Sequence, residues 1–347
     1  MASHGDKAKR CAAPLGVPFL MLFAVVPNAP AAGETLRDVV FTEYSERSSG
    51  AEIARRMLSP LTMADLNLQA KRTGKTMVEQ SINLADEKFL VYLPAQKPAK
   101  GFALLVFVPP WQDARLPPGW GAALDRYGVI FVTAARSGNN ESTLDRRQPL
   151  ALLAAENVMR RYSVDPERIY IAGFSGGARV ALRLALGYPD LFRGAILNAG
   201  SDSIGSLQVP LPPRELLLKF QNSVRIIYVT GAADTHRHNL DLASMGSMRR
   251  WCVFNVRDHA EPFAGHDVAG GAAMFWAFIA LRQASHPDPD RLAACRSSIG
   301  ADLKLRLHQV ESLLESRRQD DARRLLTQID AEYGRLAAPS SFDLGRP

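Results

Sequence analysis

Short apolar runs alternate with amphipathic helical patterns through most of this 347-residue chain. The runs carry Val, Ile and Leu at consecutive positions, as do strands that are buried on both faces of a sheet. Alternation of strand and helix predicts a mostly parallel, doubly wound α/β sheet with helices on both faces. The eight predicted strands are TMVEQSINL (76–84), KFLVYLPA (88–95), FALLVFVP (102–109), VIFVTAA (129–135), RIYIAGF (168–174), GAILNAG (194–200), RIIYVTG (225–231) and CVFNVRD (252–258).

Three strong helical patterns separate these strands, at 150–162, 177–188 and 267–284, and each ends shortly before a proline. The first two strands are separated by only three residues, so we expect them to pair as an antiparallel hairpin. Together these elements predict one large α/β domain over residues 76–298, which is long enough to bury a substantial core.

The segments on either side of this domain have other patterns. Residues 32–75 form a mixed, partly helical lead-in with a break at Pro60. Residues 299–347 carry apolar side chains at helical spacing in two stretches, which predicts an amphipathic helical hairpin. We expect the hairpin to pack on the α/β body, although a partner-binding module has the same pattern. Residues 201–224 are either a cap over a substrate cleft or a long connection.

The N-terminal 31 residues predict a secretory signal peptide. They combine a basic start, a short apolar stretch at 12–26, and small residues at Ala29 and Ala31 before the expected cleavage point. The apolar stretch is short for a membrane span, and an uncleaved anchor is the alternative. We therefore expect an exported protein, periplasmic or secreted, without a stable membrane span after signal removal.

Export bears on the cysteines. Cleavage would leave Cys252 and Cys295. An oxidising compartment permits a disulfide between them, and two buried thiols are the alternative, because sequence alone does not give their separation.

Charge and residue spacing argue against two classes of function. The net charge is +7 and the sequence pI is about 9.4, but no run of five like charges and no nucleic-acid-binding motif occurs. No H-x-x-x-H or comparable set of ligands suggests a metal. We expect no nucleic-acid partner, no metal site and no cofactor.

The motif Gly173-Phe174-Ser175-Gly176-Gly177 matches G-x-S-x-G and lies between a predicted strand and a predicted helix. That context places the serine on a tight turn, with its hydroxyl above the edge of the sheet. The N-terminus of the following helix would direct free N–H groups and a positive dipole end at the same point. Ser175 is therefore the predicted nucleophile.

A serine needs a base to attack a carbonyl, and in this arrangement an acid and then a histidine follow it along the chain. Asp234 directly follows the strand 225–231, and His266 lies in the loop before the last helix of the α/β domain. We predict that Asp234 orients His266 and that His266 takes the serine proton. Less favoured residues nearby are Asp258 as a reserve acid, His259 as a competing base, and His236 and His238 as cleft-lining groups.

An oxyanion hole requires two donors. The Gly176 N–H should be one of them, and the loop after the third strand should supply the other. That loop begins with two prolines, which have no N–H, so Trp111 offers the first donor and Gln112 the next. Trp111 could also stack on a substrate. With Gln112, Asn139 and Phe174 it makes up the predicted substrate-binding set, although the loop around Asn139 is equally typical of a plain turn.

With these residues placed, the chain resembles the polyhydroxybutyrate-depolymerase/feruloyl-esterase-like branch of the α/β hydrolases. The best match is VDPERIY (164–170) leading into GFSGGARVALRLALGYPDLFRGAILNAG (173–200), and the similarity extends over 76–284. The resemblance implies an eight-stranded α/β-hydrolase fold and ester hydrolysis by an exported, cofactor-free enzyme that uses a Ser-Asp-His triad. The chain departs from the family at Pro109-Pro110, where His-Gly is usual. It also lacks the usual polymer-binding domain, which argues against degradation of a solid polymer.

The leading hypothesis is thus a carboxylic-ester hydrolase that forms an acyl-enzyme on Ser175, with a small-molecule or oligomeric ester as substrate. One alternative is a serine peptidase of the same fold acting on small peptides, because the same triad attacks either carbonyl. Another is a non-catalytic binding protein on a hydrolase body. The sequence does not specify the acyl group, the alcohol or the oligomeric state.

Overall fold

A single sheet organises the molecule. The computed structural model describes residues 1–2, 33–74, 78–283 and 287–338. Within them, eight strands follow the order β1-β2-β4-β3-β5-β6-β7-β8. β1 pairs antiparallel with β2, β2 pairs antiparallel with β4, and all other pairs are parallel. The strands are β1 (Glu34–Val39), β2 (Phe89–Leu93), β3 (Phe102–Val108), β4 (Val129–Ala134), β5 (Val164–Phe174), β6 (Gly194–Asn198), β7 (Arg225–Gly231) and β8 (Val256–Glu261). The predicted eight-stranded, mostly parallel sheet is confirmed.

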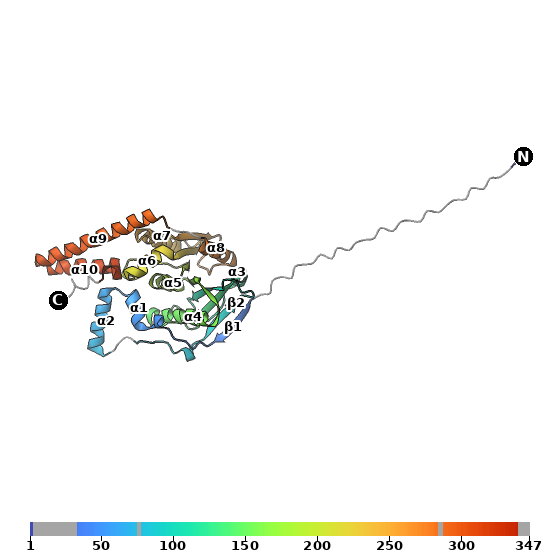
Figure 1. The fold of residues 1–347 in the computed structure, drawn as a ribbon, viewed down its shortest axis with the longest axis horizontal. Coiled ribbons are helices and arrows are strands. Elements are labelled where there is room, and N and C mark those ends of the chain that lie inside the picture. The colour runs from blue at the N-terminus through green and yellow to red at the C-terminus, as the bar shows by residue number, and fades with distance from the viewer. Residues whose placement is uncertain (3–32, 75–77, 284–286, 339–347) are drawn as a thin grey trace. The chain divides into compact units, whose positions relative to one another are not determined.

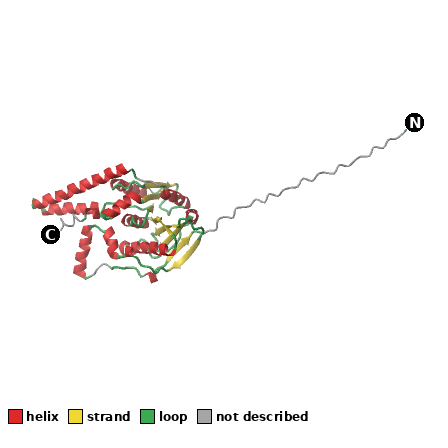
Figure 2. Ribbon diagram, viewed as in Figure 1, coloured by secondary structure: helices red, strands yellow, loops and turns green. Residues whose placement is uncertain are grey.

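Two buried clusters line the two faces of this sheet. Alternate residues of β4 divide between them: Ile130 and Val132 belong to one cluster, and Val129 and Phe131 to the other. This division follows from the period of two along a strand. In Figure 2 helices lie above and below the strands. The first cluster includes residues of α4 (Gln148–Arg161) and α5 (Gly176–Gly187), and the second includes α3 (Trp120–Tyr127) and α8 (Gly271–Arg282).

The predicted first strand is wrong. In the described part of that segment, residues 78–84, no strand forms, and the strand that pairs with β2 on the outer edge of the sheet is β1 from the predicted lead-in. Ile82 and Leu84 are buried, so their alternation is real, but it reflects packing of an extended segment without strand pairing. β1 is an edge strand with mostly exposed side chains, and it therefore carries no apolar pattern that sequence could reveal.

The predicted last strand is shifted along the chain. β8 begins at Val256 rather than Cys252, and it extends to Glu261. Cys252 and Val253 are fully buried, but they precede the strand and pack as part of the connection that leaves the preceding helix. That helix, α7 (Thr235–Arg250), has no clear apolar face and was not predicted.

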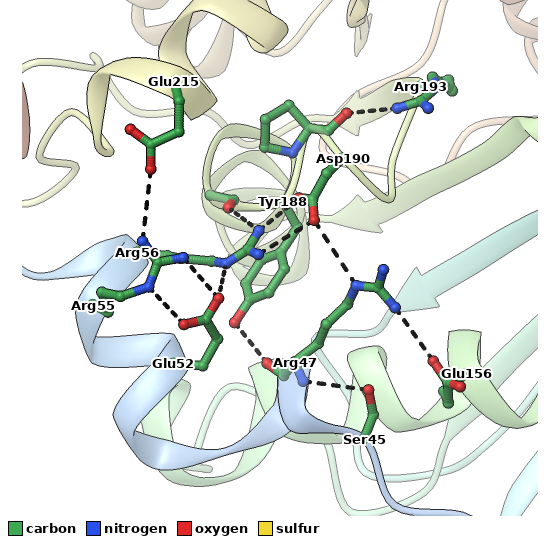
Figure 3. Close-up of polar contacts among 12 residues, drawn as sticks. Ser45, Arg47, Glu52, Arg55, Arg56, Glu156, Tyr188, Asp190, Arg193 and Glu215 are labelled. Atoms are coloured by element: carbon green, nitrogen blue, oxygen red, sulfur yellow. Dashed lines mark hydrogen bonds and ion pairs between the residues drawn. The ribbon is translucent and has the colours of Figure 1, made fainter.

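The lead-in contains two helices, α1 (Gly50–Met57) and α2 (Pro60–Thr73). Pro60 is the first residue of α2, where its missing N–H costs nothing, and Ser59 caps that helix through a bond from the Thr62 N–H. Figure 3 shows α1 fastened to the body: Arg56 reaches Asp190, and the Tyr188 hydroxyl donates to the Arg47 carbonyl.

The C-terminal helices lie side by side (Figure 1). They are α9 (Pro289–Glu315) and α10 (Gln319–Tyr333), which confirms the predicted helix pair, although α9 begins ten residues before the predicted start at 299. Asp288 caps this earlier start by accepting from the Asp290 and Arg291 N–H groups. The pair packs on the body, with Tyr333 buried edge-on against Trp251. The connection between β6 and β7 contains one further helix, α6 (Arg214–Ser223).

A disulfide joins Cys252, just after α7, to Cys295 in α9. This resolves the alternative that the sequence left open. Residues 3–31 of the predicted signal peptide fall outside the described residues. Among the helices that are described, none has the length and apolar character needed to cross a membrane.

Candidate active site

Ser175 occupies the sharp turn between β5 and α5. β5 ends at Phe174 and α5 begins at Gly176, which leaves Ser175 between them with φ 55° and ψ −120°. Positive φ is unfavourable for a residue with a side chain and persists where the surroundings hold it. Here the Ser175 N–H donates to the Asn198 carbonyl at 2.8 Å. The strained turn presents the hydroxyl at the carboxyl edge of the sheet.

The glycines of the motif allow this turn to pack closely. A Cβ on Gly173 would lie 2.3 Å from the Gly177 carbonyl carbon, and a Cβ on Gly177 would lie 1.9 Å from the Val108 carbonyl oxygen. A Cβ on Gly176 would lie 2.2 Å from the Asn139 Oδ1. These approaches leave no room for any other residue, so the motif is a packing requirement of strand, turn and helix.

Ser175, His266 and Asp234 form a continuous hydrogen-bonded chain. His266 Nε2 lies 3.0 Å from Ser175 Oγ, and its Nδ1 lies 2.7 Å from Asp234 Oδ2. Although burial raises the pKa of Asp234, the hydrogen bonds from His266 and the Arg237 N–H lower it more, so it lies below its ordinary value. An ionised Asp234 accepts a hydrogen bond from His266 Nδ1 when that nitrogen carries the proton. In this tautomer Nε2 is unprotonated and can accept a hydrogen bond from the serine hydroxyl.

The less favoured acid and base lie elsewhere. Asp258 and His259 are part of β8, and the His259 ring stacks on Trp276 of α8 with centroids 4.7 Å apart. His236 and His238 lie in the first turn of α7, and neither lines the cavity at Ser175. The structure therefore brings only His266 and Asp234 of the described candidates to the serine.

Within the described chain, the loop after β3 leaves the predicted oxyanion donor Trp111 with a free backbone N–H. Among the described residues, the backbone N–H groups of Trp111 and Gly176 have no hydrogen-bond acceptor. The loop is tied to the loop after β4, because the Asn139 N–H donates to the Pro110 carbonyl at 3.0 Å. The Gln112 side chain adds a second link between these two loops, because its Nε2 donates to Glu141 at 3.1 Å.

The predicted binding residues take different positions. Asn139 lines the cavity at Ser175, whereas Trp111, Gln112 and Phe174 do not. Phe174 packs between the Trp111 ring, at a centroid distance of 6.2 Å, and the His266 ring, at 5.1 Å. Phe174 therefore packs against the His266 imidazole and helps to hold its position.

Comparisons with known proteins give partial sequence matches. No family model matches the chain. It is 42% identical over 95 residues to poly(3-hydroxyalkanoate) depolymerase C of Paucimonas lemoignei, covering 24% of this chain and 23% of that protein. It is 30% identical over 96 residues to an acetylxylan esterase of Coprinopsis cinerea, covering 28% and 23%. A solved ferulic acid esterase has a TM-score of 0.45 at 17% identity, covering 56% of this chain and 92% of that one.

The chain has an α/β-hydrolase fold and resembles esterases in sequence. The chain spans at most 35% of the length of the curated relatives it matches.

One arginine that sequence reasoning missed holds the loops around Ser175 together. Arg147 is 4% exposed at the end of a short π-helix, Thr143–Arg147. Its guanidinium donates to the Ser137 carbonyl at 3.0 Å, the Pro109 carbonyl at 2.9 Å and the Gly176 carbonyl at 3.5 Å. Burial lowers the pKa of Arg147 to about 10. Nothing in the sequence distinguishes this residue from the other arginines.

A cavity of about 630 Å³ opens beside Ser175. One wall is the face of α5 that carries Gly176, and the junction of α1 and α2 forms another. Residues 207–210 form a third wall, so part of the segment 201–224 lies against the cleft. Clefts of this size suit small organic ligands.

Proposed function

We propose that this hydrolase cleaves carboxylic esters through an acyl-enzyme on Ser175. The hydrogen-bonded chain from Ser175 through His266 to Asp234 carries the proposal, because it supplies the nucleophile, the base and the group that orients the base. The sequence similarity to proteins named as esterases supports ester hydrolysis over other acyl transfers.

In the first half of the reaction, Ser175 Oγ attacks the ester carbonyl carbon while its proton passes to His266 Nε2. The carbonyl electron pair moves onto the oxygen, where the Gly176 and Trp111 N–H groups would stabilise the negative charge. His266 then gives its proton to the leaving oxygen as the ester C–O bond breaks, and the alcohol departs.

The second half repeats these roles with water. His266 takes a proton from water, whose oxygen attacks the acyl carbon. The bond from that carbon to Ser175 Oγ breaks, and the proton returns to Oγ as the free acid leaves. Asp234 remains ionised throughout and stabilises the imidazolium each time it forms.

The two alternatives use the same site differently. A serine peptidase would have to protonate an amine leaving group, which departs less readily than an alcohol. A non-catalytic binding protein would have no use for a base held 3.0 Å from a serine on a strained turn. Neither alternative has a specific observation in its favour.

We also propose that the protein works outside the reducing cytosol, in the periplasm or the medium. The Cys252–Cys295 disulfide supports this proposal, because such bonds persist mainly in oxidising compartments. The predicted signal peptide at 1–31 supports it as well.

The decisive test is labelling with a fluorophosphonate probe, followed by a panel of p-nitrophenyl esters and peptide amides. We expect labelling at Ser175, turnover of esters, little turnover of amides, and loss of both signals in Ser175→Ala. A folded protein that takes up no label and hydrolyses nothing would overturn the proposal in favour of a binding role. Faster cleavage of amides than of matched esters would favour the peptidase.

A further inference from the structure

The cavity beside Ser175 is strongly basic. Five arginines line it, and Asp202 is the one carboxylate among its described lining residues. The arginines are Arg56, Arg147, Arg179, Arg183 and Arg237. A neutral ester needs no such concentration of positive charge, and only some of these guanidinium groups are paired within the part of the protein that the structure describes.

Arg56 is neutralised within the protein. Figure 3 shows its guanidinium between Glu52 and Asp190. It donates to Glu52 at 2.6 Å and to both oxygens of Asp190, at 2.6 and 3.2 Å. Two carboxylates already surround this arginine, so it leaves no positive charge for a ligand.

Arg147 and Arg183 are also engaged, but mostly by neutral carbonyls. Arg147 donates to three backbone carbonyls and contacts no carboxylate among the described residues. Arg183 donates to Asp202 at 2.8 Å and to the carbonyls of Arg179 and Gln208. Their donors are used, but the charge of Arg147 is not neutralised.

Arg179 and Arg237 keep donors for a ligand. Arg179 makes one ion pair, at 3.4 Å, with Asp202, which is shared with Arg183. The Arg237 guanidinium makes no hydrogen bond or ion pair within the described ranges, and its neighbour Asp234 is bonded to His266. With Arg56 set aside, four arginines and one aspartate line this cavity, so its lining carries an excess of positive charge.

A second, independent observation points to a ligand in the same cavity. Gln148 lines it with 0% exposure, and neither the nitrogen nor the oxygen of its side-chain amide has a hydrogen-bond partner among the described residues. Buried amides are almost always paired, and an unpaired one is costly.

The spacing along α5 sets the scale of the ligand. Gly176, Arg179 and Arg183 lie on one face of this helix, because residues three and four apart are neighbours there. At a rise of 1.5 Å per residue, Arg179 lies about 6 Å along the helix axis from Ser175. Val180, Leu207 and Val209 line the space between with apolar groups, which suit a short hydrocarbon chain.

We infer that this hydrolase selects esters that carry a free carboxylate, held by Arg179 and Arg237 while Ser175 attacks the ester. Guanidinium groups bind carboxylates through paired, charge-assisted hydrogen bonds, and those bonds are strongest in a partly buried site. The inference rests on the proposed ester hydrolysis at Ser175 and adds the chemical class of its substrate.

The test compares two p-nitrophenyl esters that differ only at the far end. One is the monoester of adipic acid, and the other is the ester of adipamic acid, in which a neutral amide replaces the free carboxylate. The extended chain between their two carbonyl carbons is about 6 Å long, which matches the rise along the helix axis from Ser175 to Arg179. We expect kcat/KM to favour the carboxylate by about tenfold or more, the range for a hydrogen bond to a charged group. The preference should shrink as salt rises. Equal kcat/KM values would overturn the inference.

Variants show whether the predicted arginines carry the preference. We expect Arg179→Gln and Arg237→Gln each to reduce the ratio of the two kcat/KM values, and the double variant to bring it close to one. The ratio cancels any general loss of activity, including one caused by a change near Asp234. Arg249→Gln is the matched control, because it removes an exposed charge from α7 outside the cavity and should keep the ratio. An equal loss in this control would contradict the assignment.

Binding separates this inference from the proposed function. Adipate is titrated calorimetrically into Ser175→Ala, which requires no hydrolysis. We expect saturable binding that weakens in Arg179→Gln and Arg237→Gln. Adipate binding by a protein that takes up no fluorophosphonate would support the anion site and overturn ester hydrolysis. Labelling and ester turnover without adipate binding would overturn the anion site alone.

Discussion

Asp234 Oδ2 lies 2.7 Å from His266 Nδ1, and the same aspartate caps helix α7 by accepting from the Arg237 N–H at 3.2 Å. One carboxylate therefore orients the proposed base and begins the helix that carries a proposed substrate-binding arginine. Because of this double role, replacing Asp234 acts both on the imidazole of His266 and on the start of α7.

We expect Asp234→Asn to lower kcat by roughly 10³–10⁴-fold, because an amide favours the wrong imidazole tautomer. An asparagine is also a good helix cap, so the thermal midpoint should change little. Steady-state kinetics together with a circular-dichroism melt would separate the two effects. Asp258→Asn, on β8, serves as the control and should leave kcat near the wild-type value. A small loss in Asp234→Asn would show that another acid serves His266.

Arg147 should act on catalysis through the loops that it holds. We expect Arg147→Met to lower kcat by about 10- to 100-fold, because the Pro109 and Gly176 carbonyls lose their common donor and the oxyanion donors beside them lose their alignment. KM for a neutral ester should change much less. A purely structural role would instead lower the thermal midpoint and the yield of folded protein while kcat per folded molecule stayed constant. Arg126→Met, on the surface of α3, is the control.

Glu52 should make stability depend on pH. Hydrogen bonds from Arg55 lower the pKa of Glu52 to about 2, against burial, and Arg56 contributes in the same direction. Because the folded-state pKa is depressed, the stabilisation is complete above the ordinary pKa of 4.5 and is lost as the pH falls toward 2. We expect Glu52→Gln to lose about 1–2 kcal/mol of unfolding free energy at pH 7, after allowance for solvent screening.

Urea denaturation of both proteins at pH 7, 5 and 3.5 would measure this difference. It should be similar at the two higher pH values and smaller at the lowest. Glu215→Gln is the control, because its carboxylate lies 3.7 Å from Arg55 with 63% of its side chain exposed, and its removal should change little. A difference that stays constant across the pH range would contradict the ionic origin.

The disulfide should matter for stability and not for turnover. It closes a loop of 43 residues between α7 and α9, for which chain entropy predicts about 4 kcal/mol at most. We expect Cys252→Ser with Cys295→Ser to lower the thermal midpoint, while kcat of the folded protein stays close to wild type. Free-thiol mass spectrometry of the wild-type protein would verify the bond first. Two free thiols in non-reduced protein would contradict it.

The sequence by itself determined the features that depend on local rules. The central strands β3 to β7 are buried on both faces, so their apolar runs are continuous and recognisable. The turn at Ser175 needs glycine at Gly173 and Gly177 because backbone atoms approach there within van der Waals distance, and this requirement is written directly into the motif. Chain order then predicted the residues that the structure brings to the serine, His266 and Asp234.

Only the tertiary structure decided the edge of the sheet and the character of the cleft. β1 is held by backbone pairing to β2, and backbone hydrogen bonds leave no trace in side-chain patterns. Arg147, Arg179 and Arg237 come from three separate helical elements, and what distinguishes them is their place around one cavity and the few carboxylates that line it. Such properties arise from distant segments meeting in space, so each arginine is ordinary in the sequence and becomes specific only in the fold.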